Sequence, residues 1–277
     1  MTYAQIAIAV DADDAVQTRL EICRDIALAT RAAVIGIAAA SPPPPAFGVE
    51  FSGGSSADLL VAYREATEVD LMQAHSAFAL HLTGPDIISR WISAHGDPTA
   101  FCIRQARFAD LVVLGCRNSR APYQAPDPAE VLIASGRPVL MVPPTVPRSP
   151  VGEHALIAWR DGKEARRAVS AALPLLRLSR GVTIAAICSG DEDRQSLDEE
   201  LAELPEYLAR HGVAAGVVQD RLMHDTVGLH LLQEAASRGC GLIVAGGYGH
   251  PRLQEWMLGG VTRDLMRESS VCLLLSH

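Results

Sequence analysis

Short apolar runs alternate along the chain with longer segments whose apolar positions repeat at helical spacing. Strands that are apolar throughout, such as residues 242–245, suit a sheet that is covered by helices on both faces. Alternating strands and helices indicate a parallel, doubly wound α/β sheet. In the C-terminal half the pattern predicts strands near 155–159, 182–188, 213–219, 241–246 and 271–275, and helices near 163–178, 196–211, 226–238 and 260–269.

The same pattern occurs twice in the chain. Three strand-like runs of the first half have counterparts in the second, and the first run of each half ends in Asp and precedes an amphipathic segment. The chain is therefore a tandem duplication. The matching runs are QIAIAVD (5–11) with ALIAWRD (155–161), DLVVLG (110–115) with GLIVAG (241–246), and GRPVLMVP (136–143) with SVCLLL (270–275).

We expect two domains, residues 1–146 and 151–277, each built on five parallel strands. They join near PPTVPRSP (143–150), where prolines exclude both a helix and a central strand. The last strand of each domain has no helix after it, so we expect these two strands to pair with one another. Only the first domain carries the insertion SPPPPAFGVEFSGGSSAD (41–58), which is either an irregular loop or a lid over a cleft.

Composition narrows the class of protein. The net charge is −8 and divides into −4 for residues 1–150 and −4 for 151–277, which argues against a nucleic-acid surface. No apolar run approaches the roughly 20 residues of a membrane helix, and the N-terminus lacks a signal-type basic region, so we expect a cytoplasmic protein. The six cysteines lie far apart, which suits small buried apolar residues better than a disulfide framework.

A glycine-rich segment, GGYGHPRLQEWMLGGVT (246–262), lies between the fourth strand and last helix of the second domain. Gly246 and Gly249 would allow positive φ and close approach of a ligand, while backbone N–H groups at 259–261 would face an anion at a helix N-terminus. Thr262 adds a hydroxyl, and His250 or Arg252 adds positive charge. The alternative is that these glycines only turn the chain. Neither GxxxxGK[ST] nor GxGxxG is present.

The spacing Gly246-x2-Gly249-x9-Gly259, followed by Gly-Val-Thr, resembles the ATP-binding motif of the universal stress protein family. GHPRLQEWMLGGVTRDLM is similar to the family's C-terminal stretch, and the duplication resembles its tandem members. The resemblance covers nearly all of the 277 residues. It implies five-stranded domains of the adenine-nucleotide α-hydrolase type, paired through their last strands. It also implies a stress-response regulator that binds ATP, with ADP or AMP as alternatives and Mg²⁺ as an accompanying ion.

The resemblance also implies which residues hold the nucleotide. An acidic residue follows the first strand in the family. Asp11 takes that place in the first domain, whereas Arg160 takes it in the second and Asp161 is displaced by one. Gly260 stands where many ATP-binding members have Ser or Thr. The implied site comprises Arg160, Asp161, Ile187, Ala245, Gly246, Gly249, His250, Arg252, Gly259, Gly260, Val261 and Thr262.

The first domain departs from the motif. Asn118 replaces the second glycine, and Pro128, which has no N–H, replaces the third. Asp127 as N-cap and Glu130 at the third helical position would cap this helix and repel phosphate. We therefore expect the first domain to be a structural partner with a degenerate site.

Other candidate chemistry is weaker. His224 and Asp225 fall in the loop before the predicted helix 226–238, with His230 nearby, and a further metal ligand at clear spacing is missing, so we favour solvated loop residues over a metal site. We expect Trp159 to pack at a domain surface. No GxSxG elbow exists, so we expect a binding protein with an unidentified protein partner, and a homodimer is possible. The alternatives are a scaffold that binds a protein or a small apolar ligand without nucleotide, and a slow ATP hydrolase.

Overall fold

Strands and helices alternate throughout the part of the chain that the structure describes. The structure is a computed structural model and describes residues 2–11, 15–42, 56–116, 125–146, 148–188, 201–222, 226–248 and 260–277. The first half contains β1 (Gln5–Ala9), α1 (Val16–Thr30), β2 (Ala33–Ala40), α2 (Ser56–Leu82), β3 (Ser89–His95), α3 (Pro98–Ala106), β4 (Leu111–Gly115), α4 (Pro128–Ala134) and β5 (Val139–Val142).

The second half repeats this order. It contains β6 (His154–Ala158), α5 (Lys163–Leu178), β7 (Gly181–Cys188), α7 (Leu204–Arg210), β8 (Ala215–Arg221), α8 (Val227–Ser237), β9 (Cys240–Gly246), α9 (Gly260–Glu268) and β10 (Cys272–Ser276). Helix α5 has the bounds that the sequence predicts, and the described strands agree with the prediction to within two residues. Part of the predicted helix 196–211 precedes α7 and lies outside the described residues.

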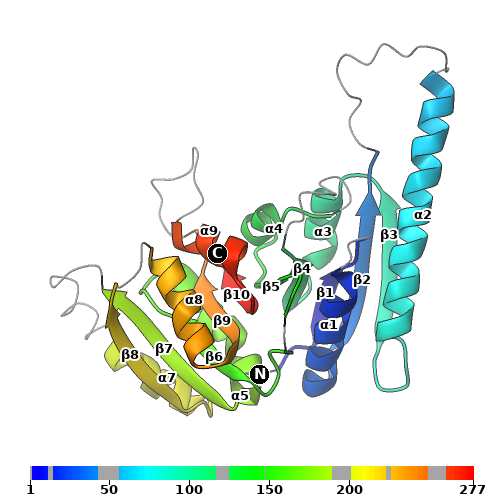
Figure 1. Cartoon of the computed structure of the whole chain (residues 1–277). Coiled ribbons are helices and arrows are strands. Elements are labelled where there is room, and N and C mark those ends of the chain that lie inside the picture. Colours follow the sequence, from blue (N-terminus) through cyan, green and yellow to red (C-terminus); the bar gives the residue numbers. More distant parts are fainter. Residues whose placement is uncertain are drawn as a thin grey trace.

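The strands form one sheet in the order β3-β2-β1-β4-β5-β10-β9-β6-β7-β8 (Figure 1). Neighbouring strands within each half are parallel. The two halves meet where β5 pairs with β10 in the antiparallel sense, with Leu140 opposite Leu274. Both leucines are fully buried. The expected pairing of two five-stranded parallel halves through their last strands is confirmed, whereas the bounds 1–146 and 151–277 as folding units stay a prediction.

Helices cover both faces of the sheet. Buried side chains of α1, α2, α5 and α7 pack on one face, and those of α3, α4, α8 and α9 pack on the other. Residues along β1 alternate accordingly, since Ile6 and Ile8 belong to the first cluster and Ala7 and Ala9 to the second. This double covering explains why the strands are apolar throughout. The buried cysteines Cys23, Cys102, Cys240 and Cys272 carry free thiols.

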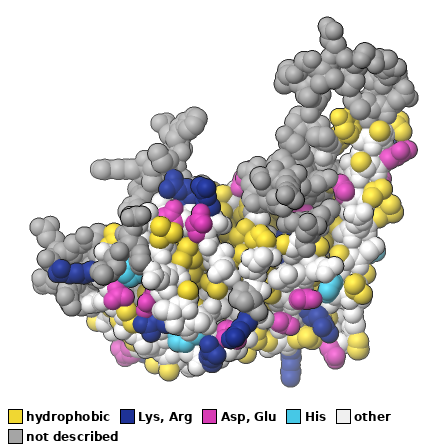
Figure 2. All heavy atoms as spheres, in the orientation of Figure 1, with side chains coloured by type: hydrophobic (Ala, Val, Ile, Leu, Met, Phe, Trp, Pro, Cys, Tyr) yellow, Lys and Arg dark blue, Asp and Glu magenta, His cyan; other side chains and the backbone are white. Residues whose placement is uncertain are grey.

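Helix α2 extends well beyond the edge of the sheet (Figure 1). It packs through Leu71, Ala74 and Phe78, while hydrophobic side chains are also visible along its exposed side (Figure 2). Residues 43–55 precede it and lie outside the described residues, so the choice between loop and lid stays open. On the face shown, Figure 2 has acidic and basic side chains interspersed. Among the described helices, none is long and apolar enough to cross a membrane.

The β5–β10 seam generates the first prediction. Replacing Leu140 or Leu274 with Asp buries an unpaired carboxylate in the centre of the sheet, and we expect the free energy of unfolding to fall by at least about 3 kcal/mol. Both halves should lose stability together, measured by urea denaturation and by limited proteolysis. Leu80→Asp is the control, because Leu80 is 77% exposed. Cleavage near Thr145 that releases two stable, non-associating halves would contradict this arrangement.

Candidate functional site

The second half has a topological switch point between β6 and β9. After β6 the chain enters α5 on one face of the sheet, and the connection from β9 leads to α9 on the other face. Ala158 lies opposite Ala245, so Trp159 and Gly246 follow side by side at the carboxyl edge. Ligands of open α/β sheets bind at such a point. We therefore place the candidate site at this edge.

Gly246 serves the packing of helix α5. A Cβ at this position would lie 2.7 Å from the backbone nitrogen of Ala165 and 3.0 Å from the carbonyl carbon of Glu164. The φ angle of Gly246 lies outside the left-handed region, so the expectation that this residue curls the chain with positive φ is wrong. Its missing side chain makes room for the first turn of a helix.

The turn after β9 contacts the first half of the chain. Tyr248, with φ of 61°, is the residue that adopts the left-handed conformation. Gly247 donates its N–H to the carbonyl of Ser276 at 2.8 Å, and a Cβ on it would lie 2.8 Å from Leu132 of α4. Burial raises the pKa of the Tyr248 phenol to about 12, and the carboxylate of Asp127 adds to the rise. The second half's carboxyl edge thus packs against α4 of the first half.

Helix α9 begins at the residues that the motif predicted. Gly260 is exposed, and a Cβ on it would meet no atom of the described residues within 4 Å. The first turn of α9 contains no acidic residue. The sequence analysis expected the hydroxyl of Thr262 to be a donor to the ligand. Thr262 is only 5% exposed, so this hydroxyl does not lie on the open surface. The available donors at this helix start are therefore backbone N–H groups.

The remaining implied residues are apolar residues of the core cluster, charged residues that follow β6, and residues outside the described ranges. Ile187 and Ala245 are buried in the apolar cluster beneath α8 and α9, and Val261 packs against that cluster. Arg160 is exposed, while Asp161 accepts two hydrogen bonds from the guanidinium of Arg166, the one from Nε at 2.8 Å. Those bonds hold the pKa of the Asp161 carboxyl below its ordinary value. Gly249, His250, Arg252 and Gly259 lie outside the described residues, so the cradle itself stays a prediction.

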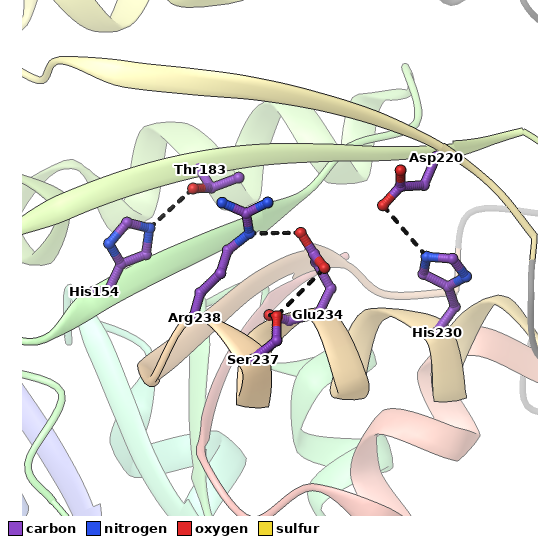
Figure 3. Close-up of polar contacts among 7 residues, drawn as sticks. All are labelled: His154, Thr183, Asp220, His230, Glu234, Ser237 and Arg238. Carbon is purple, nitrogen blue, oxygen red and sulfur yellow. Dashed lines mark hydrogen bonds and ion pairs between the residues drawn. The ribbon is translucent and has the colours of Figure 1, made fainter.

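His230 lies in α8, within the helix predicted for 226–238, and its side chain is buried. Its Nε2 lies 3.6 Å from a carboxylate oxygen of Asp220 on β8, and the two side chains face one another (Figure 3). Nearby, Arg238 pairs with Glu234 one turn away on the same helix at 2.5 Å. These contacts attach α8 to the sheet and stabilise its last turn. His224 and Asp225 lie outside the described residues.

The corresponding switch point of the first half is filled by the protein itself. Arg19 of α1 is 1% exposed, and its guanidinium lies 2.5 Å from the carboxylate of Asp11. A Cβ on Gly115, at the end of β4, would lie 2.0 Å from the Arg19 guanidinium. Asp11 therefore binds an internal cation.

The start of α4 is also capped as predicted. The Asp127 carboxylate accepts hydrogen bonds from the N–H groups of Ala129 and Glu130, at 2.9 and 3.2 Å. Glu130 lies in the first turn, so two carboxylates occupy this helix end. Asn118 lies outside the described residues. The buried Arg19 is a further feature of the first half's site, which we expect to be degenerate. The sequence analysis did not identify it.

The sequence comparisons give no assignment, since no known family and no curated protein matches the chain. The fold does match solved structures. A universal stress protein from Archaeoglobus fulgidus DSM 4304 superposes with a TM-score of 0.70 at 16% identity, covering 98% of this chain and 97% of that one. A protein of unknown function from Pseudomonas aeruginosa PAO1 gives a TM-score of 0.59 at 14% identity, covering 98% of this chain and 92% of that one.

A shorter match is the structure of a protein with a bound nucleotide. The universal stress protein from Archaeoglobus fulgidus in complex with dAMP covers 46% of this chain and 99% of its own, at 16% identity and a TM-score of 0.38. At that similarity, the ligand of this chain has to be inferred from its own residues. The full-length matches establish the fold: this chain has the fold of a tandem universal stress protein, and the resemblance seen in the sequence is confirmed at that level.

Two glycines of the motif should respond differently to a methyl group. Gly246→Ala forces the first turn of α5 away from the sheet, and we expect a loss of about 1–3 kcal/mol in the free energy of unfolding. Gly260→Ala adds its methyl to open space, so we expect a change of less than about 1 kcal/mol. Urea denaturation of both variants tests this, and equal losses would contradict the packing role of Gly246.

The buried ion pair of the first half gives a further prediction. Arg19→Ala removes the guanidinium partner of a buried carboxylate, which typically costs about 3–5 kcal/mol. The double variant Arg19→Met with Asp11→Leu should recover much of that loss, because no charge remains buried. Arg24→Ala, an exposed position on the same helix, is the control. If Arg19→Ala lowers the free energy of unfolding no more than Arg24→Ala does, the buried Arg19–Asp11 pair does not stabilise this edge of the sheet.

Proposed function

We propose that this chain is a universal stress protein whose second half binds an adenine nucleotide, ATP in the first place, while its first half is a structural partner. The observation that carries the proposal is the contrast between two equivalent helix starts. Among the described residues, nothing covers the start of α9 at Gly260, and its first turn contains no acidic residue. The start of α4 is capped by Asp127, with Glu130 beside it.

Of the helix starts of α4 and α9, electrostatics favours phosphate at α9. The N–H groups at a helix start lack helical partners and carry partial positive charge, which attracts anions. Gly260 and Val261 would present such groups to the phosphates, and Mg²⁺ would accompany ATP as its ordinary counterion. Since Asp161 is engaged by Arg166, we do not assign it a contact with the ribose.

Buried apolar side chains lie close to this helix start. Ile187 and Ala245 lie near the carboxyl ends of β7 and β9, on either side of β6, and both belong to the cluster against which Val261 packs. A purine ring needs apolar contact of this kind, together with a few polar groups that fix its orientation. We therefore expect the base to approach the carboxyl ends of β7 and β9, and the phosphates to approach α9.

The role that follows is binding-linked regulation. A nucleotide that binds the folded second half stabilises it and shifts the population of its conformations, which would change the contacts of the protein with its partner. Two other functions remain as outcomes of the test. A scaffold would show no nucleotide response, and a slow ATP hydrolase would release phosphate from bound ATP.

Gly260 allows a matched test, because its surroundings are open to a side chain. Gly260→Asp places a carboxylate at the start of α9, whereas Gly260→Asn places a neutral group of the same shape there. A charge at a helix end contributes about 1 kcal/mol, so we expect ATP binding to weaken at least about five-fold in the Asp variant relative to the Asn variant. Isothermal titration with ATP, ADP and AMP measures this, and the difference should shrink from ATP to AMP.

Thermal shifts on the same proteins provide the control for folding. Both variants should melt close to the wild type without nucleotide. If ATP raises the melting temperature of the wild type and of both variants equally, the nucleotide binds elsewhere. A folded wild type that responds to none of the three nucleotides favours the scaffold, and phosphate release during incubation with ATP favours the hydrolase.

A further inference from the structure

A cavity lies on the opposite face of the sheet from α9. It has a volume of about 570 Å³ and lies between α5, α7 and the carboxyl end of β6. Small-molecule sites typically have volumes of about 300–1,000 Å³. Trp159, Val169 and Leu204 of this cavity belong to the apolar cluster beneath α5 and α7, whereas Ile187 and Ala245 belong to the cluster on the other face. We call it the Trp159 cavity; the described residues that line it are Trp159, Asp161, Arg166, Val169, Glu203, Leu204 and Tyr207.

Trp159 is buried, contrary to the surface position expected from the sequence, and its indole Nε1 has no hydrogen-bond partner among the residues that the structure describes. An indole nitrogen can only donate, and a buried donor without an acceptor is unfavourable. Nearly all buried polar groups of folded proteins are paired, with protein or with ordered water, so this N–H is available to an acceptor in the cavity. A ligand in the cavity can supply one.

The rest of the lining sets the ligand's shape. Val169 and Leu204 are buried apolar side chains. Tyr207 is half-buried and holds its ring edge-on to His211, with the ring centroids 4.6 Å apart. Two aromatic side chains and two aliphatic ones favour a flat, apolar body.

The charged groups favour a cation. Asp161 and Arg166 bind one another through two hydrogen bonds and largely cancel. Glu203 is exposed, and its carboxylate makes no capping bond to the helix that follows it. Since the described residues of the lining include two carboxylates and one guanidinium, their net charge attracts a cation and repels an anion. Aromatic faces at the same place add cation–π attraction.

We infer that the Trp159 cavity binds a small aromatic amine: a flat ring, an ammonium group for Glu203 and a hydrogen-bond acceptor for the Trp159 indole. This site is separate from the proposed nucleotide edge and does not depend on it.

Tyramine is the probe, because it combines an aromatic ring, an ammonium group and a phenolic oxygen. Two compounds of similar size separate the contributions of the phenolic oxygen and of the ammonium group to binding. Phenethylamine lacks the oxygen, and 4-hydroxyphenylacetate has a carboxylate in place of the ammonium. By isothermal titration of the full chain, we expect tyramine to bind at least ten-fold more tightly than 4-hydroxyphenylacetate and several-fold more tightly than phenethylamine.

Matched variants assign the binding to this cavity. Glu203→Gln should weaken tyramine at least about five-fold, whereas Glu206→Gln, an exposed carboxylate that pairs with Arg210 outside the cavity, should leave it unchanged. Trp159→Phe should abolish the preference for tyramine over phenethylamine. Gly260→Asp should not affect tyramine, which keeps this result independent of nucleotide binding.

The opposite results would overturn the inference. A folded wild-type protein without saturable tyramine binding excludes the proposed ligand class, and equal effects of Glu203→Gln and Glu206→Gln place any binding elsewhere. If Trp159→Phe fails to fold, the pair of glutamate variants still decides, because both positions are exposed. Tighter binding of 4-hydroxyphenylacetate than of tyramine would show that the cavity selects anions.

Discussion

The antiparallel pairing of β5 with β10 organises the rest of the molecule. A strand at the end of a parallel sheet leaves a row of backbone N–H and C=O groups without partners, and such an edge invites aggregation when it is apolar. Here Val139, Leu140 and Met141 meet Leu273, Leu274 and Leu275, and all of them are fully buried. Each half therefore supplies the missing neighbour of the other. Because the pairing is antiparallel, the carboxyl edges of the two halves face in opposite directions.

This arrangement gives the two carboxyl edges different surroundings from one duplicated sequence. Gly115 and Gly246 end equivalent strands, and in both cases the space of a side chain is taken by the helix that follows the first strand. In the first half the Arg19 guanidinium takes this space, and in the second half the backbone of α5 takes it. The glycine at this position is thus explained by packing in both halves. What distinguishes the halves chemically is the next helix start, which is acidic in α4 and open in α9.

Much of this fold could be predicted from the sequence because its signals are local. The apolar runs, the repeat and the cap at Asp127 each depend on a few neighbouring residues, and the structure has them where expected. The contacts of Arg19 with Asp11 and of Arg166 with Asp161 were missed. In each case an acidic residue after a strand is followed by an arginine in the next helix, and that spacing could have indicated the pairs. The roles of Gly246 and Tyr248 depend on tertiary packing and backbone angles, which glycine spacing alone does not determine.

Helix α5 physically links the two candidate binding regions of the second half. Its first turn fills the space beside Gly246 at the carboxyl edge, and Arg166 and Val169 on its next turns line the Trp159 cavity. A helix packed at this density moves as a unit, because side chains in a close-packed core cannot shift independently. A ligand that displaces α5 from the cavity side would therefore also alter the packing at Gly246. Coupling between the sites requires only that the two ligands prefer different positions of this one helix.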